Sequence, residues 1–571
     1  MNTFKIIIII ILLGCSFSGC EEKILDKEPL TIFSENDVWT DMSLASKFAT
    51  NIYNCLEDYG VGSVPGGHYW RGGRAFPGCV TDEVYDHHGD QFVNVWNIGA
   101  LSPADMAFKQ SCWSSIWEAK YSYIRKCNIF LANIDNVEAT ETEKSELKGE
   151  VKYLRARYYY DLVTYWGGVP LITEVFELDD EFEMSRTPYE DLVDWIVSEL
   201  DEAREMLPEQ RTADEFGKVN RGACLALKSN LLLHANSKLH DPSTEPSGPL
   251  FDYTKDTWDE CAKAAKAVID MPQFSLEEVD DFMDYHGIFM YPPKAEIIFA
   301  KPYHPNYRGR GHNITTTSSP PYWGGWGMNN PRHDFVQDFE MANGMKIDEP
   351  GSGYNPSIDS MYENRELRFY ANILYNGATY RGRELEYHLP GGLESTDNNT
   401  ANASRTGYNL RKFVDEEENF GVTLGNDPWV YLRLAEMYLN YAEAQYNMGN
   451  ENLAREYVNI IRNRVKLPDI NSSGEALFED IQHERKIELC FEHHRFYDVR
   501  RWMIADVTCN EDVRGLRWKK VDSNGDLDPD GELTVEEYTA AEHTFFDKMY
   551  YLPIPQSEVE KSGLTQNPGY N

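Results

Sequence analysis

Apolar side chains recur every three to four residues along much of the first half of the chain, which is the period of an α-helix. One stripe runs from Trp113 to Ile134 and places Trp113 and Trp117 in the predicted core. The same period marks residues 151–165, 189–206, 221–238 and 258–269. The sequence Gly167-Gly168-Val169-Pro170 follows the second stretch and should end that helix. The pattern predicts a series of helices joined by short turns.

A second group of helices is predicted near the C-terminus. The clearest pair is 430–448 and 452–465, joined by Gly449-Asn450. Ala435, Ala442 and Ala454 are small enough for two helices to approach closely, as in tetratricopeptide-like hairpins. A strict 34-residue repeat is absent, so we expect irregular hairpins in a mainly α fold.

Residues 291–426 have a different texture, with many Gly, Pro, Asn and aromatic residues and few helical patterns. Long loops carried on a rigid frame often hold binding sites. We therefore divide the chain into an N-terminal leader at 1–19, a helical region at 20–240 and a C-terminal region at 241–571. The last includes the loop-rich stretch and the hairpins of 430–502.

The chain begins like an exported protein. Lys5 precedes an apolar run, 6–13, that is too short to span a bilayer. Small residues precede both Cys15 and Cys20, as in the lipobox of bacterial lipoproteins. Cys20 leaves a normal spacer after the apolar run, so we predict lipidation at Cys20. A plain soluble exported protein is the alternative.

The amino-acid composition limits the classes of partner that this protein can bind. The chain of 571 residues is 42% hydrophobic and 26% charged, which is ordinary for a folded protein. Its net charge of -40 would repel phosphate backbones, so nucleic acid is excluded as a partner. Aromatic residues reach 13%, which suggests that some rings are displayed for stacking. Eight cysteines follow Cys20 without a C-x-x-C pair, and we interpret them as buried free thiols although their even number permits disulfides.

Several segments in order resemble the SusD/RagB family of surface glycan-binding lipoproteins. They run from Leu25-Asp26 to the C-terminal end of the chain: 150–156 with 168–170, 220–228, 336–344, 364–369, 431–444, 484–488 with 501–502, 552–555 and 566–570. Glu366 and Cys490 depart from the usual residues without threatening the fold. Glu21 and Glu22 after Cys20 resemble the signal that places Bacteroidetes lipoproteins on the outer face of the outer membrane.

This resemblance implies a tetratricopeptide-like scaffold, a SusD-like α-superhelix, with a large loop-rich ligand-binding face. It also implies a cell-surface protein, lipid-anchored in the outer membrane, that captures oligosaccharides. It would deliver them to a SusC-like TonB-dependent transporter, which it covers as a lid. Oligopeptide capture for the same type of transporter is the alternative. Which glycan, linkage or peptide is bound stays open.

The sequence does not favour an enzyme. The carboxylates that could hydrolyse a glycoside are Asp82-Glu83, Asp179-Asp180-Glu181 and the series Glu484, Glu488 and Glu492. Asp179-Asp180-Glu181 is most simply a solvated loop. Arg485 lies three residues before Glu488, and Glu492, Arg495 and Asp498 are also three residues apart. This spacing predicts a structural network of ion pairs between neighbours on a helix. His483-Glu484 does not continue as a zinc-protease motif, and no nucleophile elbow or P-loop occurs. A surface glycoside hydrolase remains the less favoured alternative.

Aromatic rings on predicted loops are the candidates for sugar stacking, because the C-H faces of sugars pack on such rings. The predicted platform comprises Trp96, Tyr303, Tyr307, Trp323 and Trp326, with Arg71 as a hydroxyl donor. The family's aromatic residues come from similar regions. For any single ring, a place in the core is an equally good interpretation.

An acidic segment fits the spacing of a calcium loop, D-x-D-x-D-G with Glu at position 12. The expected ligands of a structural Ca²⁺ are the side chains of Asp526, Asp528, Asp530 and Glu537 and the carbonyl of Glu532. The alternative is an acidic surface turn, since no obvious helix precedes the segment.

Overall fold

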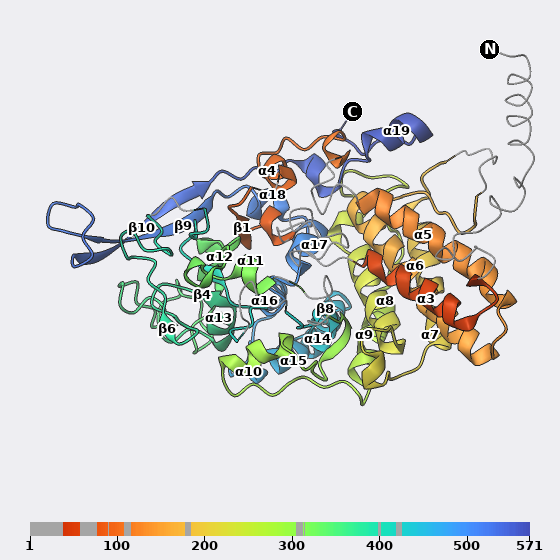
Figure 1. Cartoon of the computed structure of the whole chain (residues 1–571), viewed down its shortest axis with the longest axis horizontal. Helices are drawn as coiled ribbons and strands as arrows, with labels where there is room; N and C mark the ends of the chain where they lie inside the picture. The colour runs from red at the N-terminus through yellow and green to blue at the C-terminus, as the bar shows by residue number, and fades with distance from the viewer. Residues whose placement is uncertain are drawn as a thin grey trace, which may run out of the picture.

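The computed structural model of the protein describes residues 38–56, 77–89, 91–107, 116–176, 184–303, 312, 314–397, 401–417 and 425–570. Figure 1 shows long helices gathered at one end of the molecule and a β-hairpin projecting at the opposite end. Among the described residues, no helix combines the length and the apolar composition that crossing a bilayer requires.

At the helical end, most helices that follow one another in the sequence also pack against one another. The elements are α3 (Met42–Ile52), α5 (Ile116–Asn133), α6 (Glu141–Trp166), α7 (Tyr189–Met206), α8 (Arg221–Ala235) and α9 (Trp258–Ile269). Helix α6 packs against α5 and α7, while α8 packs against α7 and α9. The predicted bounds of α7 and α9 are confirmed, and α8 ends three residues before the predicted Lys238.

Helix α6 is longer than the apolar pattern predicts. It begins at Glu141, where Thr140 and Glu143 form a reciprocal capping box. It ends at Gly167, which has a φ of 73° and whose missing Cβ would lie 2.5 Å from the carbonyl oxygen of Leu250. A side chain there would meet both an unfavourable backbone conformation and a clash. The predicted stop is confirmed, and the capping box explains the earlier start.

The C-terminal hairpin packs onto the helical end. Its elements are α14 (Leu434–Asn447), α15 (Glu451–Arg464) and α16 (Glu475–Glu488), followed by α17 (His494–Arg501). Ala435, Ala442 and Ala454 are fully buried, as predicted. The helix predicted from Val430 is wrong over its first four residues. These belong to strand β8 (Trp429–Arg433), which pairs antiparallel with β2 (Ile297–Lys301), a distant segment that local periodicity cannot reveal.

The predicted loop-rich stretch is confirmed over its described residues. These hold only short elements: β2, α11 (Ile314–Ser318), the 3-10 helix η8 (Pro321–Trp323), β3 (Asn329–Pro331), α12 (His333–Asp338), α13 (Leu367–Asn372), β4 (Ile373–Leu374), β5 (Thr379–Tyr380), β6 (Arg383–Glu384) and β7 (Asn409–Leu410). The strands form two-stranded pairs, among them β1 (Val84–Asp86) with β3, β4 with β7, and β5 with β6.

The projecting hairpin consists of β9 (Val513–Val521) and β10 (Glu532–Ala541). It is the longest strand pair in the described part of the chain and was not predicted. Beyond it lie η9 (Asp547–Tyr550) and α19 (Gln556–Ser562). Cys127, Cys224, Cys261, Cys490 and Cys509 are buried free thiols, which confirms the thiol interpretation for these five.

Candidate functional site

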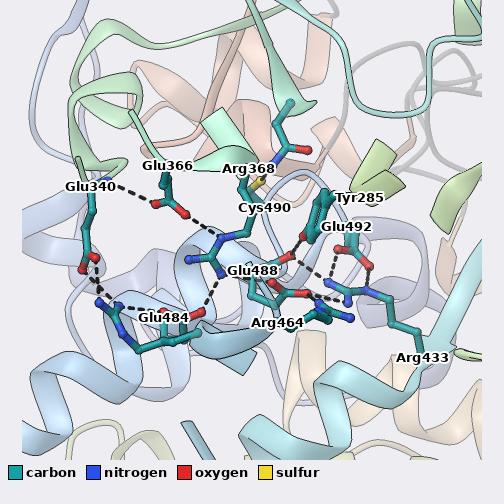
Figure 2. Close-up of polar contacts among 12 residues, drawn as sticks. Tyr285, Glu340, Glu366, Arg368, Arg433, Arg464, Glu484, Glu488, Cys490 and Glu492 are labelled. Atoms are coloured by element: carbon teal, nitrogen blue, oxygen red, sulfur yellow. Dashed lines mark hydrogen bonds and ion pairs between the residues drawn. The ribbon is translucent and has the colours of Figure 1, made fainter. Parts of the chain in front are cut away.

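The predicted carboxylates of α16 lie inside the protein and bind arginines. Arg368 donates from Nη1 to Glu484 at 2.5 Å and to Glu488 at 3.0 Å (Figure 2). Arg433 donates to Glu488 at 2.8 Å and to both carboxylate oxygens of Glu492. Figure 2 shows the carboxylates pointing toward these guanidinium groups. The structural ion-pair network is confirmed.

The pairing within this network differs from the prediction. Arg485 binds Asp498 instead of its helical neighbour Glu488. Arg495 binds Asp82 through two hydrogen bonds of 2.8 Å. The arginines thus join segments far apart in the sequence. The three-residue spacing therefore identified which residues form ion pairs, but not which residue each of them binds.

Electrostatics reinforces a structural role. Burial acts to raise the pKa of Glu492, but the charges of Arg433 and Lys412 outweigh it and lower that pKa to about 2. Glu83 forms no ion pair with a described arginine or lysine. Burial raises its pKa to about 8, despite a hydrogen bond from the amide of Phe491 and the more distant charges of Arg495 and Lys486. Glu83, Glu484 and Glu488 are buried and the side chain of Glu492 is 4% exposed, so none of these carboxylates can reach a bound sugar.

The accessible aromatic site lies on η8. Tyr322 is 54% exposed, and the adjacent Trp323 is half-buried. Trp323 packs edge-on against Tyr380 of β5, with ring centroids 5.0 Å apart. The hydroxyl of Tyr380 is in turn hydrogen-bonded to Ser319 at 2.9 Å. We call Tyr322, Trp323 and Tyr380 the platform, because the third ring supports the two that reach the surface.

Arg383 of β6 adds a polar group to the platform. Its guanidinium lies 4.1 Å from the ring centroid of Tyr322 and 5.4 Å from that of Trp323. Glu394 accepts two hydrogen bonds from Arg383 Nη1, and Glu386 accepts one from Nη2 at 2.6 Å. The carboxylates hold the guanidinium over the rings. Aromatic faces beside fixed charged groups are suited to stacking and hydrogen-bonding a polar ring compound.

The other described candidate rings are not joined to the platform. Trp326 is half-buried, and its carbonyl oxygen lies 2.9 Å from Nε2 of His88. Tyr303 is half-buried and packs edge-on against His312, with centroids 5.0 Å apart. Within the described residues, no ring contact links Tyr303 or Trp326 to Trp323. Their part in a common surface stays a prediction.

The prediction that Trp96 belongs to the sugar-stacking surface is wrong. Its side chain in α4 (Gln91–Asn97) has no exposed surface. The indole packs against Phe496, with centroids 6.1 Å apart, and Arg500 lies 4.8 Å from its centroid. A ring with both faces covered cannot stack on a ligand. The sequence showed an aromatic residue in a polar stretch, but only the packing of α17 against this region shows that it is core.

Three predicted residues lie outside the described part of the chain: Arg71, Tyr307 and Cys20. Their assignments remain predictions from the sequence.

The predicted calcium ligands do not converge in the described structure. Glu532 and Glu537 belong to strand β10, where Glu537 lies opposite Leu516 and receives a hydrogen bond from Arg514. Asp528 instead accepts a hydrogen bond from the amide of Asp530, as in a tight turn. No group of three or more metal-ligating side chains is assembled anywhere in the described residues. These residues do not fit a calcium loop here, and calcium binding stays a prediction for titration to test.

The predicted set left out Tyr322 and Tyr380 of the platform and the neighbouring Arg383. Tyr380 and Arg383 lie in the hairpin of β5 and β6, far along the chain from η8. A tyrosine and an arginine in a loop-rich stretch give no local signal. Only the contact between this hairpin and η8 could have identified them.

The comparisons with known proteins now identify the family. Residues 295–570 match the SusD family, and residues 45–233 match a family described as starch-binding and associating with the outer membrane. The chain belongs to the SusD/RagB family. The family resemblance and the helical SusD-like fold expected from the sequence are therefore confirmed.

Relatives of this SusD/RagB protein span almost its whole length. A SusD-like protein of Bacteroides ovatus is 23% identical, over 97% of this chain and 95% of that protein. A solved SusD-like protein of Bacteroides fragilis is 28% identical, with a TM-score of 0.78 over 95% of this chain and all of that one. A second solved structure from Bacteroides fragilis, named a SusD-like carbohydrate-binding protein, is 24% identical with a TM-score of 0.73 over 92% and 98% of the two chains.

Proposed function

We propose that this SusD/RagB protein binds a neutral or weakly charged oligosaccharide on the platform of Tyr322, Trp323 and Tyr380. The exposed Tyr322 beside Trp323, with Arg383 held over both rings, is the observation that carries the proposal. The starch-binding description of the matching family and the carbohydrate-binding relative support it.

Binding without hydrolysis is part of this proposal. Two described carboxylates beside the platform, Glu386 and Glu394, both bind Arg383, and Glu416 near Tyr380 binds Arg411. A general acid and a nucleophile would need to be free to exchange protons or attack the sugar. We expect no sugar release when the protein is incubated with the polysaccharide that it binds.

The decisive experiment is a glycan array followed by calorimetry with the best ligand. Each ring contributes roughly 1 kcal/mol, so Tyr322→Ala and Trp323→Ala should each weaken binding about fivefold. Arg383→Met should also weaken it, by loss of a hydrogen-bond donor. Phe546→Ala is the matched control, since Phe546 is 51% exposed and lies next to η9.

Unchanged affinity in Tyr322→Ala and Trp323→Ala, with an intact fold, would reject the platform. A peptide mixture run beside the array tests the alternative cargo. Binding of peptides without any glycan would replace the oligosaccharide proposal by peptide capture.

We further propose that the protein is anchored in the outer membrane by lipid on Cys20 and faces the cell exterior. The matching family is described as associating with the outer membrane, and the N-terminal sequence carries the lipidation pattern. Mass spectrometry of the mature N-terminus checks this proposal. An unmodified Cys20, or lipid on Cys15, would contradict it.

Delivery of the oligosaccharide to a SusC-like TonB-dependent transporter completes the proposed function. Family membership supports it. A lid that encloses substrate needs a large interface, so the complex should survive mild detergent. Recovery of this protein without a barrel from native membranes would contradict the lid arrangement.

A further inference from the structure

A cavity of about 330 Å³ lies at the helical end of the molecule. It is formed by α5, by the segment 172–176 and by α19, which lies beside α5 in Figure 1. This cavity, which we call the α5–α19 pocket, shares no lining residue with the platform. The proposed glycan binding does not use it.

The interior of the α5–α19 pocket is aromatic and apolar. Its walls include Trp117, Tyr121, Ile124, Phe176 and Met184. The ring of Trp117 packs against Tyr121, with centroids 5.1 Å apart. The hydroxyl of Tyr121 donates to the carbonyl of Pro170 at 2.8 Å. The two rings are therefore held in place before any ligand arrives.

The rim of the pocket is acidic. Glu118 of α5, Glu174 and Glu558 of α19 line it. Within the described residues, none of these three carboxylates forms an ion pair with a lysine or arginine. One cation, Arg125, lies at the same rim, and its Nη1 donates to the carbonyl of Phe176 at 2.7 Å. Arg186 also lies near Tyr121, but it donates to the carbonyls of Gly168 and Trp166 and is not part of the lining. The lining therefore carries three carboxylates and one guanidinium, which makes the pocket entrance negative.

An aromatic floor below a negative rim selects a particular chemical group. Anions are repelled by the carboxylates, and a purely apolar group would contact the aromatic floor without using the charges at its border. A lysine or arginine side chain satisfies both zones, because its methylene stem packs on apolar surface while its charge reaches the rim. Aromatic rings also attract cations directly.

We propose that the α5–α19 pocket is a docking site for a lysine or arginine side chain of a protein partner. Charge complementarity argues for a polypeptide partner: this chain carries a net charge of -40, so a basic segment would be steered to it. A single inserted side chain gives specificity to a larger interface, of which it is one anchor.

The test uses two blocked tripeptides, acetyl-Gly-Arg-Gly-amide and acetyl-Gly-Glu-Gly-amide, titrated into the full chain and followed by ligand-observed NMR. We expect the arginine peptide to bind with a dissociation constant near the millimolar range, since one side chain provides few contacts. Added salt should weaken binding. The glutamate peptide should not bind.

Variants separate the pocket from the general charge of the surface. The triple substitution Glu118→Gln, Glu174→Gln and Glu558→Gln should weaken arginine-peptide binding at least tenfold. The control triple Glu138→Gln, Glu260→Gln and Glu479→Gln removes three exposed carboxylates elsewhere and should leave it unchanged. Met184→Trp, which fills the pocket but keeps its charges, should also abolish binding.

Two results would overturn the proposal. Equal weakening by the two triple variants would show that only the overall charge matters. Tighter binding of free arginine, with its charged termini, than of the blocked peptide would assign the pocket to a small ligand. Neither result depends on glycan binding, because the platform variants Tyr322→Ala and Trp323→Ala should bind the arginine peptide normally.

Discussion

Arg433 holds Glu492 through two hydrogen bonds, from Nε at 2.6 Å and from Nη2 at 2.8 Å. The arginine precedes α14 and the glutamate follows α16, so the pair joins the start of one helix to the end of another. Arg433 also reaches Glu488 and Glu296. This one buried guanidinium connects the helical hairpin to the loop-rich region.

Removal of that guanidinium should therefore destabilise the whole protein. Arg433→Met leaves Glu488 and Glu492 with less compensation in a buried site, and a broken buried pair costs about 3 to 5 kcal/mol. The free energy of unfolding in urea measures the loss. Lys263→Met is the control, because Lys263 pairs with Asp259 on the surface of α9 and its loss should leave the unfolding midpoint unchanged. Similar midpoints for both variants would contradict a structural role for the network.

Glu83 should make stability fall with rising pH. Burial raises its pKa from 4.5 to about 8, so the unfolded chain loses the proton first. The contribution of Glu83 is complete below pH 4.5 and is lost as pH rises toward 8. Glu83→Gln should remove this loss, so its free energy of unfolding relative to wild type should rise by a few kcal/mol, roughly, between pH 4.5 and pH 8. Urea unfolding at the two pH values checks it, with exposed Glu479→Gln as the control. A parallel pH dependence in wild type and Glu83→Gln would show that Glu83 titrates normally.

Substitution by alanine should lower stability at Trp96 and glycan affinity at Trp323. Trp96→Ala removes a fully buried ring and should cost about 3 to 5 kcal/mol of stability. Trp323→Ala removes a half-buried ring at the surface and should mainly weaken glycan binding. Thermal unfolding and calorimetry on both variants separate the two effects. Loss of glycan affinity in a folded Trp96→Ala variant would restore Trp96 to the binding site.

The acidic turn of the β9–β10 hairpin allows a direct test of calcium. Since Glu537 is held by Arg514 in the strand pair, we expect the unfolding temperature to be the same in 5 mM calcium chloride and in EDTA. Asp528→Asn should behave like wild type. A rise in unfolding temperature with calcium that Asp528→Asn abolishes would restore the site predicted from the sequence.

Local patterns were enough to find most of the helical frame. The bounds of α7 and α9 follow from apolar periodicity, and the end of α6 follows from Gly167. These signals are carried by residues within one or two turns of each other, which is the range of helical hydrogen bonds and caps. The family resemblance was found for the same reason, because each of the short segments that carry it is a continuous stretch of sequence.

Strand pairing and the choice between surface and core depended on distant contacts. Residues 430–433 have a helical pattern but form β8, because β2 offers hydrogen bonds to their backbone. Trp96 resembles a displayed ring until Phe496 covers it. The residue spacing of a calcium loop is present in the sequence. In the structure, however, Glu532 and Glu537 lie in the extended strand β10, which pairs with β9, instead of in a curved loop.

The binding face shows the same division. The sequence by itself determined that Trp323 lies in a loop-rich stretch rich in aromatic residues. The tertiary structure decided that Tyr380 supports it and that Arg383 is held over it by Glu394. A helix is specified by neighbours along the chain, whereas a platform is specified by side chains from separate segments, and their meeting depends on how the whole chain packs.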